Sequence, residues 1–142
     1  MNKMSTATIV AGATAATLAA VLRGSITTAR VVGSSMAPTL KDGQRLLVIR
    51  RRWRRPGRGD VVVFSNPRRP HSPSWLVKRV AAMAGDVSPI DQSVVPAGQV
   101  AVLGDGPESL DSRQLGNIEE RSILGVVAHP RWEVFGARSE TC

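Results

Sequence analysis

The chain has 142 residues, enough for about one domain with a modest hydrophobic core and one additional segment. Nineteen Lys and Arg residues against eleven Asp and Glu residues give a formal charge of +8, which suits an anionic partner such as a membrane surface or a nucleic acid. Its single cysteine is Cys142, so a disulfide within the chain is excluded and a cysteine-based metal site is not expected. We therefore predict neither a metal nor a cofactor.

Residues 4–22 contain no charged side chain and lie between Lys3 and Arg23. About twenty such residues can cross a bilayer as a helix, although this stretch is rich in Ala and Thr and only marginally hydrophobic. A cleavable signal peptide and a soluble or interfacial helix are the alternatives. We predict that residues 1–26 form an N-terminal membrane anchor or an uncleaved signal-like segment.

From about Thr27 the sequence changes to short β-type runs that are separated by turns containing Gly or Pro. The predicted strands are residues 29–32, 45–49, 60–64, 75–83, 100–103, 123–128 and 132–135. No segment after the N-terminus shows a helical period of useful length. This pattern predicts a mainly β domain over residues 27–135, built as an antiparallel sheet or barrel, and a loose tail over residues 136–142.

Much of the excess positive charge lies in residues 50–58, which read Arg-Arg-Arg-Trp-Arg-Arg-Pro-Gly-Arg. The simplest interpretation is a solvated hairpin or loop. A second is a patch that contacts the head groups of anionic membrane lipids. Nucleic-acid binding ranks third, and none is expected, because Trp53 alone is thin support for base stacking.

A possible catalytic pair is Ser35, which follows a β-type run ending at Gly33, and Lys78, which lies in an apolar run. A serine hydroxyl needs an aligned base to act as a nucleophile, and a lysine amine can be that base only when it is neutral. Burial can lower the pKa of a lysine from about 10.4 by the roughly 2–3 units that this requires. A Ser-His-Asp triad is the weaker model, because His71 and His129 both lie beside prolines.

Three segments resemble the signature boxes of the type I signal peptidase family (peptidase family S26), the membrane-bound Ser/Lys proteases that remove leader peptides. The resemblance extends over residues 31–127. Residues 33–40 are similar to the nucleophile box, and residues 78–80, followed by Gly85-Asp86, are similar to the general-base box. The third box is matched by Gly104, Asp105, Ser109, Asp111, Ser112, Arg113 and Gly116.

The resemblance implies that Ser35 is the nucleophile and Lys78 the general base of a serine endopeptidase that forms an acyl-enzyme. It further implies that the hydroxyl of Ser109 orients the lysine amine. The backbone N–H of Ser35 would be one oxyanion donor, and Met36 would lie close to the substrate groove. Some relatives place a second, hydroxyl donor two residues before the nucleophile; that position is Gly33 here, so the second donor stays unassigned.

Two ion pairs behind the site are implied in the same way, between Arg79 and Asp105 and between Asp111 and Arg113. The third box departs from the family pattern, because Gly106 replaces an asparagine and the loop from Asp105 to Ser109 is one residue shorter. The large second β-domain of many relatives is also missing. The chain therefore resembles the compact actinobacterial and mitochondrial inner-membrane members.

The expected partners are exported precursor proteins with cleavable leader peptides, and the expected location is a single-pass membrane protein with an extracytoplasmic catalytic domain. One alternative is a dedicated maturation protease for a single precursor, such as the leader of a nickel-type superoxide dismutase. Another, of a different class, is an inactive basic β-domain that binds a membrane or nucleic acid through residues 50–58.

Overall fold

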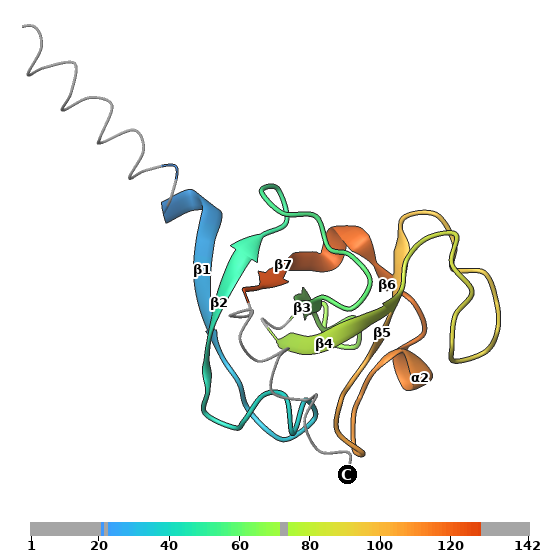
Figure 1. The fold of residues 1–142 in the computed structure, drawn as a ribbon, viewed down its shortest axis with the longest axis horizontal. Helices are drawn as coiled ribbons and strands as arrows, with labels where there is room; N and C mark the ends of the chain where they lie inside the picture. The colour runs from blue at the N-terminus through green and yellow to red at the C-terminus, as the bar shows by residue number, and fades with distance from the viewer. Residues whose placement is uncertain (1–20, 22, 72–73, 129–142) are drawn as a thin grey trace, which may run out of the picture.

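The computed structural model describes residue 21, residues 23–71 and residues 74–128 (Figure 1). They form a seven-stranded sheet with the order β1-β2-β7-β3-β4-β5-β6, in which every pair of neighbours is antiparallel. The strands are β1 (Ile26–Arg30), β2 (Arg45–Arg50), β3 (Val61–Ser65), β4 (Trp75–Ala82), β5 (Gln99–Leu103), β6 (Ile118–Glu119) and β7 (Ile123–Val127). The prediction of a mainly β, antiparallel fold is confirmed.

The predicted strand at residues 29–32 is wrong at both ends, because β1 begins at Ile26 and ends at Arg30. Thr27 and Thr28 are β-branched and pair with β2, so the strand begins earlier than expected. It ends at Arg30, although Val31 continues the alternation as a buried residue, with 5% exposed, and its N–H donates to the carbonyl oxygen of Gln44 at 2.9 Å. The predicted strand at residues 132–135 lies outside the described residues.

Three short elements were not predicted: β6, the single-turn helix α2 (Ser112–Leu115) and the 3₁₀ turn η1 (Glu120–Ser122). All three are too short to show a hydrophobic period. Between β4 and β5 the chain makes a loop with one isolated β-bridge, between Val87 and Val94.

The hydrophobic core lies on both faces of β3, near the middle of the sheet. Val61 and Val63 belong to one buried cluster, and Val62 and Phe64 to the other. The connection between β1 and β2 covers the first face, whereas α2 and β6 cover the second. The residues from Val61 to Phe64 in β3 are therefore all apolar and do not alternate with polar residues, as expected for a strand that is buried on both faces.

The predicted membrane anchor and the predicted tail fall almost entirely outside the described residues. Of the N-terminal segment, Val21 and residues 23–25 are helical, and the Ser25 hydroxyl donates a hydrogen bond to the Val21 carbonyl at 2.6 Å. Within the described ranges, no helix combines the length and the apolar character that crossing a membrane requires.

Candidate active site

Lys78 lies in the middle of β4 with its side chain directed into the protein. Alternation along the strand buries Lys78, Val80 and Ala82 on one side and leaves Arg79 partly exposed on the other. Only 2% of Lys78 is exposed. A lysine is seldom buried to this degree, so the position calls for a chemical explanation.

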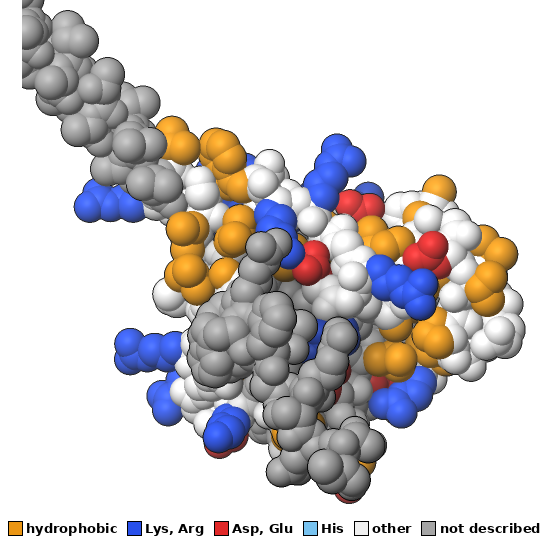
Figure 2. All heavy atoms as spheres, viewed as in Figure 1, with side chains coloured by type: hydrophobic (Ala, Val, Ile, Leu, Met, Phe, Trp, Pro, Cys, Tyr) orange, Lys and Arg blue, Asp and Glu red, His pale blue; other side chains and the backbone are white. Residues whose placement is uncertain are grey.

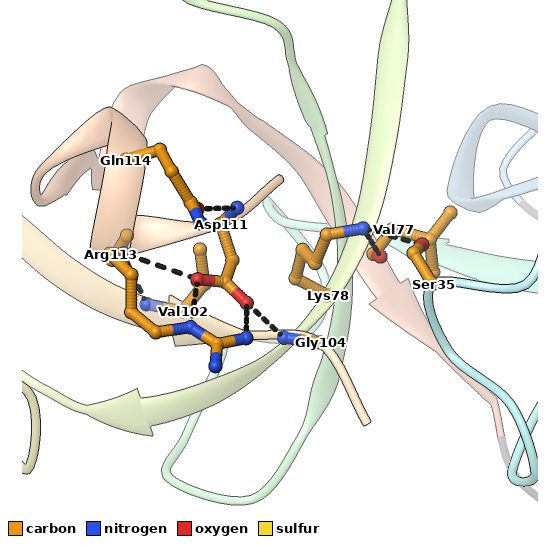
Figure 3. Close-up of polar contacts among 9 residues, drawn as sticks. Ser35, Val77, Lys78, Val102, Gly104, Asp111, Arg113 and Gln114 are labelled. Carbon is orange, nitrogen blue, oxygen red and sulfur yellow. Dashed lines mark hydrogen bonds and ion pairs between the residues drawn. The ribbon is translucent and has the colours of Figure 1, made fainter. Parts of the chain in front are cut away.

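Ser35 reaches this buried amine from the turn between β1 and β2. The Nζ atom of Lys78 is 2.7 Å from the Oγ atom of Ser35, at hydrogen-bonding distance (Figure 3). A second hydrogen bond runs from the same Nζ atom to the carbonyl oxygen of Val77, at 2.9 Å. The structure thus brings together two residues that are 43 positions apart in the sequence.

Burial lowers the pKa of Lys78 from its ordinary value, because the charged ammonium form loses its hydration. The carboxylates of Asp111 and Asp105 act in the opposite direction, and the loss of hydration outweighs them. No carboxylate forms an ion pair with Lys78 within the described residues. The environment therefore favours the neutral amine, the form that can accept a proton, more than water does.

The backbone amides of Ser35 and Gly33 differ in their hydrogen bonding. The N–H of Ser35 has no acceptor among the described residues. The N–H of Gly33 donates to Oδ1 of Asp42 at 2.9 Å, in a turn where Gly33 has a φ of +90°. Met36 is 1% exposed and packs in the core.

The segment after β5 packs directly on the serine turn. The amide of Gly106 donates a hydrogen bond to the carbonyl oxygen of Ser35 at 2.9 Å. A Cβ atom on Gly106 would lie 2.6 Å from the carbonyl oxygen of Ser34, and one on Gly104 would lie 2.6 Å from that of Ser35. Glycine is therefore required at both positions by close approach of the two backbones.

Asp111 anchors the other end of this segment and is fully buried. Its carboxylate accepts hydrogen bonds from the amide of Gly104 and from the amide and guanidinium of Arg113 (Figure 3). It also caps α2, together with the side chain of Gln114. Burial alone would raise the pKa of Asp111, but these hydrogen bonds hold it well below its usual range.

Arg79 and Asp105 form a second ion pair on the other side of β4. Two hydrogen bonds join them, at 3.0 and 2.7 Å, and the guanidinium also donates to the carbonyl oxygen of Gly59 at 2.8 Å. Such a two-point contact fixes the orientation of both groups. It links β4 to the segment that carries Gly104 and Gly106.

Ser109 is buried, but the structure gives it no hydrogen bond to Lys78. Its hydroxyl oxygen has no hydrogen-bond partner of good geometry among the described residues. It lies against Gly104, where a Cβ atom would collide with it. The orienting role expected of Ser109 therefore stays a prediction. No cluster of three or more metal-binding side chains occurs in the part of the chain that the structure describes.

Comparison with known proteins identifies the family. The family model described as signal peptidase, peptidase S26, matches residues 5–87 and 87–132. This chain belongs to the signal peptidase family.

The chain is also 37% identical over 114 residues to the mitochondrial ATP-independent inner membrane protease subunit 1b of Arabidopsis thaliana. The matched region covers 70% of this chain and 66% of that protein, so the chain spans just under two thirds of its relative.

Sequence reasoning missed several contacts around the Ser35–Lys78 pair of this signal peptidase family member. The carbonyl of Val77 and the amide of Gly106 are backbone groups, which leave no residue-type signal. The cap of α2 could have been predicted from the sequence, because Asp111 and Gln114 have the spacing of a capping box.

Proposed function

We propose that this protein is a serine endopeptidase that removes N-terminal leader peptides, with Ser35 as nucleophile and Lys78 as general base. The observation that carries the proposal is the 2.7 Å contact between Lys78 Nζ and Ser35 Oγ, with the lysine almost fully buried. Membership of the signal peptidase family supports the same reaction and the same class of substrate.

In the proposed mechanism the neutral amine of Lys78 accepts the hydroxyl proton of Ser35 as Oγ attacks the scissile carbonyl carbon. The resulting ammonium then gives that proton to the leaving amine, which leaves an ester on Ser35. The amine next takes a proton from a water molecule, which attacks the ester and releases the leader peptide. As the bond between the acyl carbon and Oγ breaks, the ammonium of Lys78 gives this second proton to Oγ of Ser35, so the enzyme ends in its starting state.

The negative charge on the tetrahedral intermediate needs a hydrogen-bond donor close to Ser35. The amide of Ser35 is the donor that we assign. The amide of Gly33 could act as the second donor only after its bond to Asp42 breaks. Arg79 with Asp105, and Asp111 with Arg113, would hold the surrounding backbone in place rather than contact the substrate.

Cleavage of a purified precursor that carries a leader peptide tests the proposal. Ser35→Ala and Lys78→Ala should each abolish cleavage while circular dichroism and thermal unfolding report a folded protein. Ser34→Ala is the matched control, because Ser34 is exposed and adjacent to the nucleophile, and it should cleave normally. Undiminished cleavage by either Ser35→Ala or Lys78→Ala would contradict the proposed pair.

We further propose that residues 4–22 anchor the protein in a membrane by a single span and that the catalytic domain lies on the extracytoplasmic side. The support is the uncharged sequence of that segment and the inner membrane protease to which the chain is similar. Extraction of membranes with carbonate is the test, because a spanning protein stays in the pellet. Release of the intact chain into the supernatant would show that it does not span.

A further inference from the structure

Four arginines line a cleft of about 410 Å³ at one end of the sheet, away from Ser35 and Lys78. Arg50, Arg51 and Arg52 come from the end of β2 and the turn after it, and Arg121 comes from η1. Trp75, the first residue of β4, lies at the same cleft. We call this feature the arginine cleft.

Among the described residues one ion pair involves an arginine of the cleft, although Arg51 and Arg121 also line a neighbouring hollow with Glu119 and Glu120. Arg50 and Arg51 have no side-chain hydrogen bond or ion pair with any described residue. Arg121 pairs with Glu119, but both side chains are largely exposed, and such surface pairs are weak. Guanidinium groups gathered in this way suit a phosphate group, which they can bind through two hydrogen bonds each.

Two exposed tryptophans lie at or close to the cleft: Trp75 lines it, and Trp53 contacts its residue Arg52. Trp53 and Trp75 are each about half exposed, and the guanidinium of Arg52 lies 5.6 Å from the ring centre of Trp53. Ile26 of β1 and Leu47 of β2 are also exposed, although neither lines the cleft. Figure 2 shows hydrophobic side chains gathered over β1 and β2, with Lys and Arg side chains around the same face. Tryptophan with arginine is the pairing found where a protein meets lipid head groups.

The contact between the arginine cleft and the N-terminal segment favours a membrane, rather than a nucleic acid, as the partner of the cleft. The guanidinium of Arg52 donates a hydrogen bond to the carbonyl oxygen of Gly24 at 2.9 Å. Gly24 follows Arg23, the charged residue at the end of the uncharged stretch of residues 4–22. The arginine cleft is thus tied to the end of the segment with the length of a membrane span.

We infer that the arginine cleft binds the phosphate groups of anionic phospholipids at the membrane surface. Trp53 and Trp75 lie at head-group depth beside it. This inference does not depend on the peptidase activity, because none of the cleft residues touches Ser35 or Lys78.

The test is a titration of the purified full chain in detergent with a short-chain phosphatidylglycerol and, separately, with the matching phosphatidylcholine, followed by tryptophan fluorescence. We expect at least tenfold tighter binding of phosphatidylglycerol. The variant Arg50→Gln/Arg51→Gln/Arg121→Gln should lose this preference. The control Arg30→Gln/Arg45→Gln/Arg69→Gln removes the same charge from exposed positions outside the cleft and should keep it.

Equal binding of the two lipids by the wild type would overturn the inference. So would a preference for phosphatidylglycerol that falls equally in the cleft variant and in the control. Inorganic phosphate that binds as tightly as phosphatidylglycerol would assign the cleft to free phosphate. If a single-stranded oligonucleotide binds more tightly than phosphatidylglycerol, and the cleft variant loses that binding, the cleft is a nucleic-acid site. Either of these two results contradicts the lipid site. Precursor cleavage in detergent should be unchanged in the cleft variant, which keeps this result separate from the test of Ser35 and Lys78.

Discussion

The backbone amide of Gly106 donates a hydrogen bond to the carbonyl oxygen of Ser35, across an N···O distance of 2.9 Å. This contact joins the segment after β5 to the turn that carries the proposed nucleophile. Gly106 stands where the family pattern has an asparagine, and the missing side chain has a structural reason. The two backbones approach too closely for any Cβ atom at this position.

We therefore expect Gly106→Ala to impair catalysis more than stability. The added Cβ would lie 2.6 Å from the carbonyl oxygen of Ser34, so the turn must shift and Ser35 moves relative to Lys78. A misplacement of about 1 Å at a reacting group can cost on the order of 100-fold in rate, and we expect kcat to fall about 10- to 100-fold. Steady-state kinetics and thermal unfolding check this together.

Gly57→Ala is the matched control for that substitution. Its Cβ would lie 3.6 Å from Oδ2 of Asp60, an ordinary van der Waals distance, so both activity and folding should be preserved. A Gly106→Ala enzyme with normal kcat would show that the close contact does not position Ser35.

Lys78→Met should abolish cleavage and stabilise the protein at neutral pH. Burial lowers the pKa of Lys78 in the folded state, so the unfolded chain binds the proton more tightly. The cost of burying the charge is therefore fully present below the folded-state pKa and disappears as the pH rises to the unfolded value. Each unit of lowering corresponds to about 1.4 kcal/mol in the free energy of unfolding.

Urea unfolding of the wild type and Lys78→Met between pH 6 and pH 10 measures this difference. The free energy of unfolding of Lys78→Met should exceed that of the wild type most at pH 6, and this difference should shrink as the pH rises. An advantage that does not change with pH would mean that Lys78 has the same pKa in the folded and unfolded states.

The pH dependence of kcat/KM should report the same group. Because the neutral amine of Lys78 is the proposed base, activity should rise with pH and level off below the ordinary lysine value of 10.5. Kinetics with a leader-bearing precursor across pH 6–10 measure the inflection. A rate that is independent of pH over this range, or that falls with it, would argue against Lys78 as the base.

Asp111→Ala should destabilise the fold by about 2–4 kcal/mol, because it removes the cap of α2 and leaves the amide of Gly104 without its acceptor. Arg113→Gln should cost less, because 46% of the Arg113 side chain is exposed. Denaturant unfolding compares the two variants. Equal losses would indicate that the ion pair, rather than the buried carboxylate, supports this segment.

The mainly β fold could be predicted from the strand and turn pattern, whereas the pairing of Ser35 with Lys78 rests chiefly on the resemblance to the signal peptidase boxes. Period-two alternation places Lys78 and Arg79 on opposite sides of β4, and Gly- and Pro-containing turns mark most strands. The contact of Gly106 with Ser35 could not be predicted in this way, because it joins backbone groups that are distant in the chain. The same holds for Ser109, whose hydroxyl lies against Gly104 without a hydrogen bond to Lys78.

The length of β1 has a consequence for which bonds the enzyme can reach. Ser35 lies nine positions after Ile26, the first residue of β1. Even a fully extended chain of that length covers only about 30 Å. If Ile26 lies at the lipid surface, the segment from Ile26 to Ser35 keeps the nucleophile within about 30 Å of the bilayer. A precursor would then be cut only where its cleavage site emerges close to the membrane.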